Sequence, residues 1–364
     1  MRVGINAEPM LRAVPTGVGV YTLALCRAFV ASGRGGDVAL FHAARDEPLP
    51  DDVAALAITS APLPLDRDSL YRAWGSHRHP VPQAAVGPLD VVHAPGPAVP
   101  PAGRATLVAT IHDLAFLRHP PSPATRVHHE GVRHARREAA RIICPSSSTA
   151  SEVVDLLEIE PDRVRVVPHG VDLEPVEPRV ADKVLAKLGV TRPYVFWVGT
   201  REPRKNLPAV LDAFAAMDHR DVMLVLAGPD RYLGELDAAP RIADRITTTG
   251  PLPRAALDAL YSRAAAFLYP SRYEGFGLPV LEAMAAGAPV VGGNASSLPE
   301  CIGDAGVLCD PDDGEAMGRA LDRLLDDPDH ADDLRQRGFD RAKLFTWAAT
   351  ARRTFEVYGE AVAS

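Results

Sequence analysis

The 364-residue sequence contains little cysteine, no long apolar run and no excess of positive charge, and each shortage excludes a class of protein. The four cysteines are widely spaced and include no CxxC pair, which argues against a zinc site and against a disulfide framework. No apolar run of about 18 residues predicts a membrane-spanning helix, and the chain begins with a strand-like segment in place of a signal peptide. A formal net charge of −8 gives no global argument for nucleic acid as a partner. We therefore expect a cytoplasmic protein that buries Cys26, Cys144, Cys301 and Cys309 as small core residues.

Metal-binding patterns are also missing. The Asp-x-Asp pairs, Asp66/Asp68 and Asp310/Asp312, lie in proline-flanked loops, and we interpret them as turn residues. The segment 118–141 is rich in histidine and arginine but poor in acids, which favours a solvated basic helix face over a metal site. Contact of this basic segment with an anionic acceptor or a membrane surface is the alternative.

The length of the chain predicts two domains, because a single hydrophobic core stops growing beyond about 250–300 residues. Short apolar runs alternate with helical periodicity, which indicates an α/β architecture with parallel sheets. A strand at 164–167 leads through Pro168 to Asp172 into a polar, proline-broken stretch typical of a linker. We predict domains of residues 1–172 and 173–346.

Residues 264–287 predict a strand, a glycine loop and a helix that begins at Pro279. The loop from Glu274 to Leu278 offers backbone N–H groups ahead of the positive end of a helix dipole, and such a position binds an anion. The carboxylates of Glu274 and Glu282 flank it, and each needs a neutral partner such as a hydroxyl group. A phosphate together with sugar hydroxyls satisfies both demands.

A second polar loop follows the apolar run 194–198 and contains Arg201 and Lys205. At the carboxyl end of a parallel sheet, these cations would point into the same crevice as the glutamate loop. Arginine offers a planar fork and lysine a point charge, and both suit phosphate. Arg204 is an alternative to Arg201, and a purely solvated pair is the alternative for the whole loop.

The first half opens with a strand at 2–5, the glycines Gly17 and Gly19, and an apolar-periodic helix at 23–30. This order is typical of a nucleotide-binding α/β domain, and we expect the glycines to lie in the loop. Thr22 stands where a dinucleotide fingerprint has its third glycine, so a nicotinamide site is weakly supported and a simple tight turn is the alternative.

His112 and Asp113 directly follow the apolar run 106–111. Groups at the carboxyl end of a parallel strand face a ligand crevice, which makes His112 the first candidate on this side. The alternative is a histidine paired with its neighbouring carboxylate, with no chemistry.

Glu274 and Glu282, separated by seven residues with Gly-Phe-Gly-Leu-Pro among them, resemble the signature of retaining GT-B glycosyltransferases, and of glycosyltransferase family 4 in particular. The resemblance implies that Glu274 meets the donor sugar and that Glu282 takes the ribose hydroxyls. It also implies that backbone amides between them meet sugar and phosphate, and these belong to Gly275, Phe276, Gly277 and Leu278.

Other positions match the same family. The resemblance implies that Arg201 and Lys205 grip the donor diphosphate and that His112, with Asp113 beside it, contacts the donor sugar. It places Gly17 and Gly19 near the diphosphate and the acceptor. His169 stands where many members have asparagine, a change between short polar groups.

The family fold implied is GT-B, an α/β architecture of two facing Rossmann-like domains with parallel sheets and an interdomain cleft. The last helix, at about 347–364, is expected to pack back on the N-terminal acceptor-side domain, and residues 173–346 to bind the nucleotide sugar. The activity implied is transfer of a sugar from a nucleotide diphosphate donor to an acceptor hydroxyl with retention of configuration.

GDP-mannose is the first choice of donor, because the motifs at 16–19, 110–114 and 295–300 look most like bacterial mannosyltransferases. We expect no metal or other cofactor, since Arg201, Lys205 and the helix dipole would neutralise the leaving phosphate. Three alternatives stay open: a UDP-sugar-dependent transferase of the same fold, a nucleotide-sugar epimerase, and a non-catalytic nucleotide-sugar-binding protein. The sequence leaves open the acceptor, the linkage, the oligomeric state and peripheral membrane contact.

Overall fold

The structure, a computed structural model, describes residues 1–12, 16–118, 122, 125–172, 176–191, 193–229 and 239–364. The chain separates into a first unit, Met1–Gly170 with Trp347–Ser364, and a second unit, Val171–Thr346. This boundary lies two residues before the predicted one, and residues 173–175 of the predicted linker fall outside the described ranges. The cleft expected between the domains stays a prediction.

The first unit contains a parallel seven-stranded sheet in the order β3-β2-β1-β4-β5-β6-β7. Because β1 pairs with both β2 and β4, the strand order reverses at β1. The crevice at the carboxyl ends of β1 and β4 is therefore the switch point at which such sheets bind ligands. The strands are β1 (Val3–Asn6), β2 (Val38–His42), β3 (Thr59–Pro62), β4 (Val91–Ala94), β5 (Thr106–Thr110), β6 (Ala139–Cys144) and β7 (Val164–Val166).

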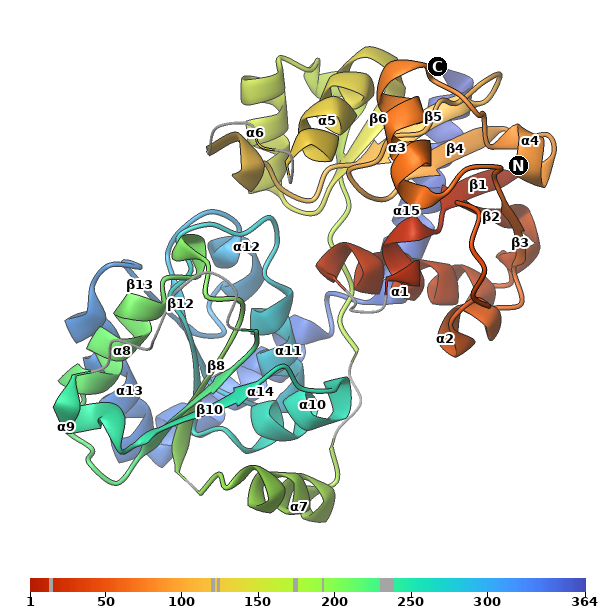
Figure 1. Ribbon diagram of the computed structural model, residues 1–364. Coiled ribbons are helices and arrows are strands. Elements are labelled where there is room, and N and C mark those ends of the chain that lie inside the picture. The colour runs from red at the N-terminus through yellow and green to blue at the C-terminus, as the bar shows by residue number, and fades with distance from the viewer. Residues whose placement is uncertain (13–15, 119–121, 123–124, 173–175, 192, 230–238) are drawn as a thin grey trace. The chain divides into compact units, whose positions relative to one another are not determined.

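Helices supply apolar side chains to two cores of this unit. One core takes residues of α1, α2 and α15, and the other takes residues of α3 to α6. The C-terminal helix α15 contacts α1, β5 and β6, and Figure 1 shows it in blue among the N-terminal elements. The helices are α1 (Gly17–Ala31), α2 (Asp51–Ala54), α3 (Arg67–Ser76), α4 (Gln83–Val86), α5 (Arg126–Glu138), α6 (Ser147–Leu157) and α15 (Trp347–Ala363), with 3-10 turns η1 (Glu8–Leu11), η2 (Gly35–Asp37), η3 (Ala115–Arg118) and η4 (Pro161–Arg163).

The start of α1 corrects the sequence prediction, which placed Gly17 and Gly19 in a loop before a helix at 23–30. The helix begins at Gly17, because the Thr16 hydroxyl accepts a hydrogen bond from the amide of Gly19 at 3.4 Å and caps the first turn. The glycine pair therefore belongs to the amino end of a helix.

The second unit contains a parallel six-stranded sheet in the order β10-β9-β8-β11-β12-β13. Here the strand order reverses at β8, so the loops after β8 and β11 flank the switch point. These are the two loops for which the sequence predicted a binding site. The strands are β8 (Tyr194–Val198), β9 (Met223–Ala227), β10 (Ile246–Gly250), β11 (Ala266–Tyr269), β12 (Val290–Gly293) and β13 (Val307–Cys309).

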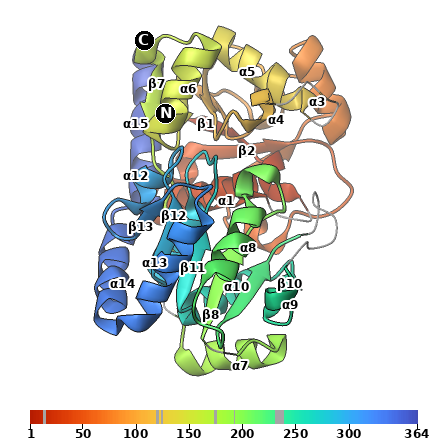
Figure 2. The same cartoon turned by 90° about the vertical axis from the view of Figure 1, so that its left-hand side faces the viewer.

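A single large core holds the second unit together, and Figure 2 shows α8 and α13 side by side. The predicted helix after the glycine loop is confirmed as α11, which ends at Gly287 in the left-handed conformation. No helix in the described ranges is long and apolar enough to cross a membrane. The helices are α7 (Pro178–Leu188), α8 (Leu207–Ala216), α9 (Pro240–Ala243), α10 (Arg254–Arg263), α11 (Leu278–Ala286), α12 (Leu298–Ile302), α13 (Gly314–Asp326) and α14 (Pro328–Ala342), with the turn η5 (Pro203–Lys205).

Candidate active site

The loops after β8 and β11 are bonded to each other at the switch point of the second sheet. The first loop ends in η5, and Asn206 then takes the left-handed conformation with φ of 55°. The Ser271 hydroxyl and the Arg272 amide, both from the second loop, donate to the carbonyl of Arg204 at 2.9 Å each. The two loops therefore hold their side chains in one fixed arrangement.

These loops form an ion cluster around Glu274. Lys205 Nζ donates to Glu274 Oε1 at 2.6 Å and to the Tyr269 hydroxyl at 2.7 Å. The Tyr269 hydroxyl donates in turn to Glu274 Oε1 at 2.9 Å. Arg204 donates from Nη1 to Glu274 Oε2 at 3.1 Å and from Nε to Glu202 at 2.7 Å. Both carboxylate oxygens of Glu274 therefore have cationic partners.

The charges of this cluster oppose the effect of burial on the pKa of Glu274 and of Lys205. Burial by itself raises the pKa of Glu274, but Lys205 and Arg204 outweigh it, and the pKa lies below its ordinary value. Burial lowers the pKa of Lys205, and Glu274 opposes that shift. Burial raises the pKa of the Tyr269 hydroxyl well above its ordinary value, and Glu274 raises it further. Near neutral pH, the cluster therefore presents an ionised carboxylate and a protonated phenol.

The structure places Arg201 and Lys205 in the same loop, and each is only 8% exposed. Arg204, the alternative to Arg201, is the arginine that contacts Glu274. Three cations and two carboxylates, Glu202 and Glu274, make this group positive overall. Such a charge suits an anionic ligand. The grip of Arg201 on a diphosphate stays a prediction.

The glycine loop ends at Gly277, the residue before α11, with φ of 130°. A Cβ at Gly277 would lie 3.0 Å from Leu298 Cδ2, which would have to shift slightly, and the positive φ by itself favours glycine. The Ser297 hydroxyl lies 2.9 and 2.5 Å from the carbonyl oxygens of Glu274 and Phe276, to one of which it donates, and it fixes the path of the loop. Among the described side chains none caps α11, so its first turn keeps the polarity that favours an anion.

Phe276, one of the predicted substrate-binding residues of this loop, has a buried side chain. The side chain of Phe276 is 6% exposed and packs against Phe345 with ring centroids 5.8 Å apart. The side chain of Phe276 therefore serves packing, and the role that the resemblance implied for Gly275 to Leu278 belongs to the backbone. Their contact with a donor stays a prediction.

Glu282 belongs to a different group of contacts, between α10 and α11. Arg254 donates from Nη1 to Glu282 Oε1, and the Tyr261 hydroxyl donates to Glu282 Oε2 at 3.0 Å. Arg254, Tyr261 and Tyr269 were not among the site residues predicted from the sequence. The available signal for Arg254 was a cation at the first position of a helix, where the dipole disfavours it.

In the first unit, His112 follows β5 and has a partner at each ring nitrogen. Nε2 lies 2.8 Å from the carbonyl oxygen of Pro95, which follows β4, and Nδ1 lies 3.1 Å from Nε2 of His169. Because a carbonyl oxygen only accepts, this geometry assigns the His112 proton to Nε2, and His169 donates to His112 Nδ1. Burial lowers the pKa of both rings, so the pair is neutral at neutral pH.

Asp113 makes no hydrogen bond to His112 among the described contacts, but its charge opposes the effect of burial on the pKa of His112. Its Oδ1 accepts a hydrogen bond from the amide of Ala115 at 2.9 Å and begins η3. Gly19 packs against η1, where a Cβ would lie 2.5 Å from the carbonyl oxygen of Pro9. A Cβ at Gly17 would meet open space, so only Gly17 leaves room for a ligand.

A buried network connects this region to the C-terminal helix. The Tyr358 hydroxyl lies 2.7 Å from His93 Nδ1, and His93 Nε2 lies 2.8 Å from the Thr110 hydroxyl at the end of β5. Burial lowers the pKa of His93 to about 3. The Tyr21 ring packs on the rings of His112 and His169, with centroids 4.8 and 4.5 Å apart. The hydrogen-bond and ring partners of His112 named above are therefore neutral groups.

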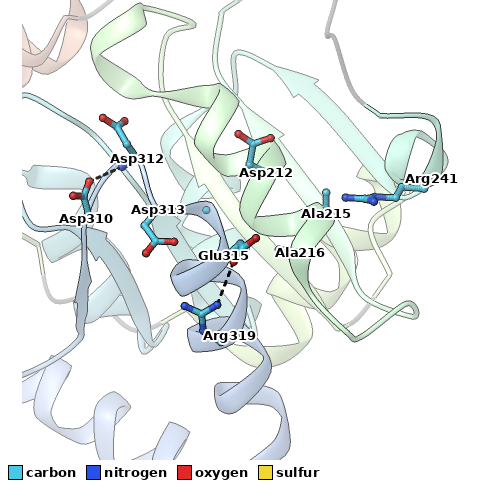
Figure 3. Close-up of a pocket in the computed structure, with 10 residues that line it drawn as sticks. Asp212, Ala215, Ala216, Arg241, Asp310, Asp312, Asp313, Glu315 and Arg319 are labelled. Atoms are coloured by element: carbon cyan, nitrogen blue, oxygen red, sulfur yellow. Dashed lines mark hydrogen bonds and ion pairs between the residues drawn. The ribbon is translucent and has the colours of Figure 1, made fainter.

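Two cavities differ in their relation to these residues. One of about 70 Å³ lies beside His112 and is lined mainly by apolar side chains. A wider one of about 900 Å³ lies beside α8 and α13, and Figure 3 shows its acidic lining. No predicted site residue lines the wider cavity. Asp310 accepts a hydrogen bond from the amide of Asp312 at 2.9 Å, as a turn residue does, and Asp66 caps α3 in the same way.

The basic segment 118–141 contributes α5, and several of its arginines have acidic partners. Arg126 contacts Glu130 at 2.8 Å, and Arg136 contacts Glu158 at 2.6 Å. These pairs favour a solvated face over a metal site. No group of three or more histidine, cysteine or acidic side chains in the described ranges is arranged to hold a metal ion.

Comparison with known proteins identifies the class. The chain matches Glycosyltransferase Family 4 over residues 15–175 and Glycosyl transferases group 1 over residues 182–341. It is 33% identical over 267 residues to O-antigen chain mannosyltransferase B of Escherichia coli, and the alignment covers 69% of each chain. The chain therefore belongs to glycosyltransferase family 4, and it is a glycosyltransferase.

Further relatives carry other names. The chain is 34% identical over 288 residues to D-inositol 3-phosphate glycosyltransferase of Salinispora tropica, an alignment that covers 71% of this chain and 59% of that one. It is 33% identical over 280 residues to MMP alpha-(1->4)-mannosyltransferase of Mycolicibacterium hassiacum, with 71% and 66% covered.

Solved structures agree on the fold. HepE of Anabaena, in complex with UDP and glucose, superimposes with a TM-score of 0.76 at 17% identity, over 99% of this chain and 100% of that one. WaaG, a glycosyltransferase of lipopolysaccharide biosynthesis, gives 0.71 at 16% identity, over 98% and 99%. These likenesses show the GT-B fold.

Proposed function

We propose that this glycosyltransferase moves a mannosyl unit from GDP-mannose to an acceptor hydroxyl, with retention of configuration and without a metal ion. The observation that carries the proposal is the ion cluster of Arg204, Lys205 and Glu274, which directly precedes the amino end of α11 at a switch point. Two relatives are named mannosyltransferases, which favours mannose over other sugars. A UDP-sugar is the alternative donor, because HepE was solved with UDP-glucose.

The cluster suggests how the leaving group is stabilised. Lys205, Arg204 and Arg201 neutralise the diphosphate as its charge grows, together with the amide end of α11. Glu274 is ionised and accepts a hydrogen bond from a sugar hydroxyl. The acceptor hydroxyl attacks the sugar from the same face that the leaving phosphate departs from. A donor phosphate oxygen takes the proton of that hydroxyl, so no protein base is assigned.

His112 requires an exchange of partners in this scheme, because both ring nitrogens already have protein contacts. A sugar hydroxyl that reaches Nδ1 replaces the donated hydrogen bond from His169. We also propose a cytoplasmic location. We further propose that the exposed Arg133 and Arg137 allow peripheral contact with an anionic surface.

Binding followed by transfer tests the proposal. Thermal unfolding with GDP-mannose, UDP-glucose, GDP and UDP ranks the donors, since a ligand at 100 times its Kd adds about 2.7 kcal/mol. We expect the largest shift with guanine nucleotides and a mannosylated product, detected by mass spectrometry, when acceptors are added. A larger shift with uracil nucleotides would move the assignment to a UDP-sugar. Turnover of the donor to a free epimer would contradict transfer.

A further inference from the structure

One face of α10 holds the carboxylate of Glu282. Arg254, Asp258 and Tyr261 stand at intervals of four and three residues, so they line one side of the helix. This side meets α11, where Glu282 lies. Arg254 donates from Nε to Asp258 Oδ1 at 2.7 Å and from Nη1 to Glu282.

The groups that contact Glu282 are themselves fixed. The Tyr261 ring is 1% exposed and packs edge-on against Phe196 and Phe267, with centroids 5.1 and 5.2 Å apart. Asp258 orients Arg254 from within its own helix. Burial by itself lowers the pKa of Arg254, but Glu282 and Asp258 raise it above its ordinary value, so the guanidinium stays charged. Each oxygen of Glu282 therefore accepts a hydrogen bond from a side chain whose conformation is fixed by its own contacts.

This arrangement leaves a defined capacity on the carboxylate. An ionised carboxylate offers about four lone-pair positions, two on each oxygen. Arg254 uses a position on Oε1 and Tyr261 uses one on Oε2. Among the residues that the structure describes, the side-chain contacts of Glu282 leave another position on each oxygen, and the side chain is 17% exposed. Two acceptor positions on one rigid group match two adjacent hydroxyls of a ribose.

We propose that Arg254 and Tyr261 are positioning residues that orient Glu282 toward a vicinal diol and so make this chain prefer ribonucleotide over deoxyribonucleotide donors. The inference rests on the proposed function and on the contact with the ribose hydroxyls that the family resemblance implies for Glu282. It adds a selectivity device on α10, outside the glycine loop and the ion cluster.

Calorimetric titration with GDP and with 2′,3′-dideoxy-GDP tests the proposal. Arg254→Gln should weaken GDP about tenfold, as loss of an outer supporting contact does, and leave the dideoxy ligand unchanged. Arg254→Lys should recover part of the loss, and Tyr261→Phe should weaken GDP less. In turnover, Arg254→Gln should raise the KM for the donor with little change in kcat. Arg263→Gln, which removes a contact to Asp182 from the same helix, is the matched control and should bind both ligands normally.

The outcomes separate the inference from the proposed function. Equal weakening of both ligands by Arg254→Gln, or no weakening of GDP, would overturn the positioning role while the donor site stands. If the wild-type protein binds GDP and UDP no better than inorganic pyrophosphate, the proposed function falls and the inference falls with it. A uracil preference leaves the test intact with UDP and its dideoxy form.

Discussion

Both units place polar residues after neighbouring strands of a parallel sheet, but the contacts in one unit are charged and those in the other are neutral. In the second unit, the loops after β8 and β11 bring Arg204, Lys205 and Glu274 into a buried ion cluster. In the first unit, the loops after β4 and β5 bring Pro95 and His112 together, and the contacts are neutral. The sheet determines where these polar residues lie, at the carboxyl ends of its strands, and the loop sequences determine whether the group is charged. A charged site suits a diphosphate, and a neutral one suits sugar and acceptor hydroxyls.

Removing one charge from the second unit should have the largest effect. Lys205→Ala takes away a cation that contacts Glu274 at 2.6 Å, so the leaving phosphate loses stabilisation and Glu274 loses a partner. We expect turnover to fall by a factor of about 10²–10³ and stability to fall by about 3 kcal/mol or more. Steady-state kinetics and urea unfolding measure the two losses. Lys183→Ala, an exposed lysine of the same unit, is the control. Normal turnover in Lys205→Ala would remove the cluster from the mechanism.

As the pH is lowered, the first unit should begin to lose stability at a higher pH than the second unit. Burial lowers the pKa of His93 to about 3 and also lowers those of His112 and His169. Unfolding returns each to about 6.5, so the unfolded chain binds more protons below that pH and stability is lost as the pH falls. The loss is about 1.4 kcal/mol per pH unit for each histidine that stays neutral. Glu274, with its pKa lowered, contributes stability above about pH 4.3 that is lost only at lower pH.

Tryptophan fluorescence can follow the units separately. Trp74 and Trp347 lie in the first unit and Trp197 in the second, so a Trp197→Phe variant reports the first unit alone. Urea unfolding at pH 7 and pH 5.5 should show the loss, and His93→Gln should make it smaller. Equal stability at both pH values would contradict the neutral network.

Substitutions at His169 should have a smaller effect that depends on hydrogen bonding. His169→Leu removes the donor to His112 Nδ1 and should cost about 1–3 kcal/mol of stability. His169→Asn keeps an N–H donor and should cost less, while both variants change the packing on Tyr21. Urea unfolding and donor turnover compare them. If Asn and Leu behave alike, the hydrogen bond to His112 contributes nothing that packing does not.

Removal of metal ions should have no effect on turnover. In the proposed mechanism the cations of the second unit neutralise the diphosphate in place of a divalent ion, so excess EDTA should leave turnover unchanged. Loss of activity that manganese or magnesium restores would contradict this and would reopen the role of the aspartate pairs.

The sequence predicted the second site better than the first. Glu274, Lys205 and the start of α11 follow strands and glycine turns that leave clear local patterns. The choice of Arg204 over Arg201 as the partner of Glu274 depends on the geometry of η5, which local pattern does not define.

Contacts between residues that are far apart in the chain could not be predicted from the sequence. Arg254 and Glu282 are 28 positions apart, and His112 and His169 are 57 apart. No periodicity connects such pairs, because tertiary packing brings them together. Gly17 and Gly19 were misplaced for a different reason: the cap from Thr16 outweighs the low helix propensity of glycine.

The most direct test of the account separates the two glutamates of the second unit. Calorimetric titration compares a nucleoside diphosphate with a non-transferable donor analogue in Glu274→Gln and Glu282→Gln. Glu274 lies in the ion cluster before the glycine loop, and Glu282 lies on α11. The account predicts that Glu282→Gln weakens both ligands about tenfold or more, whereas Glu274→Gln weakens mainly the sugar-bearing analogue. Equal weakening of both ligands by both variants would contradict the assignment of sugar to Glu274 and ribose to Glu282.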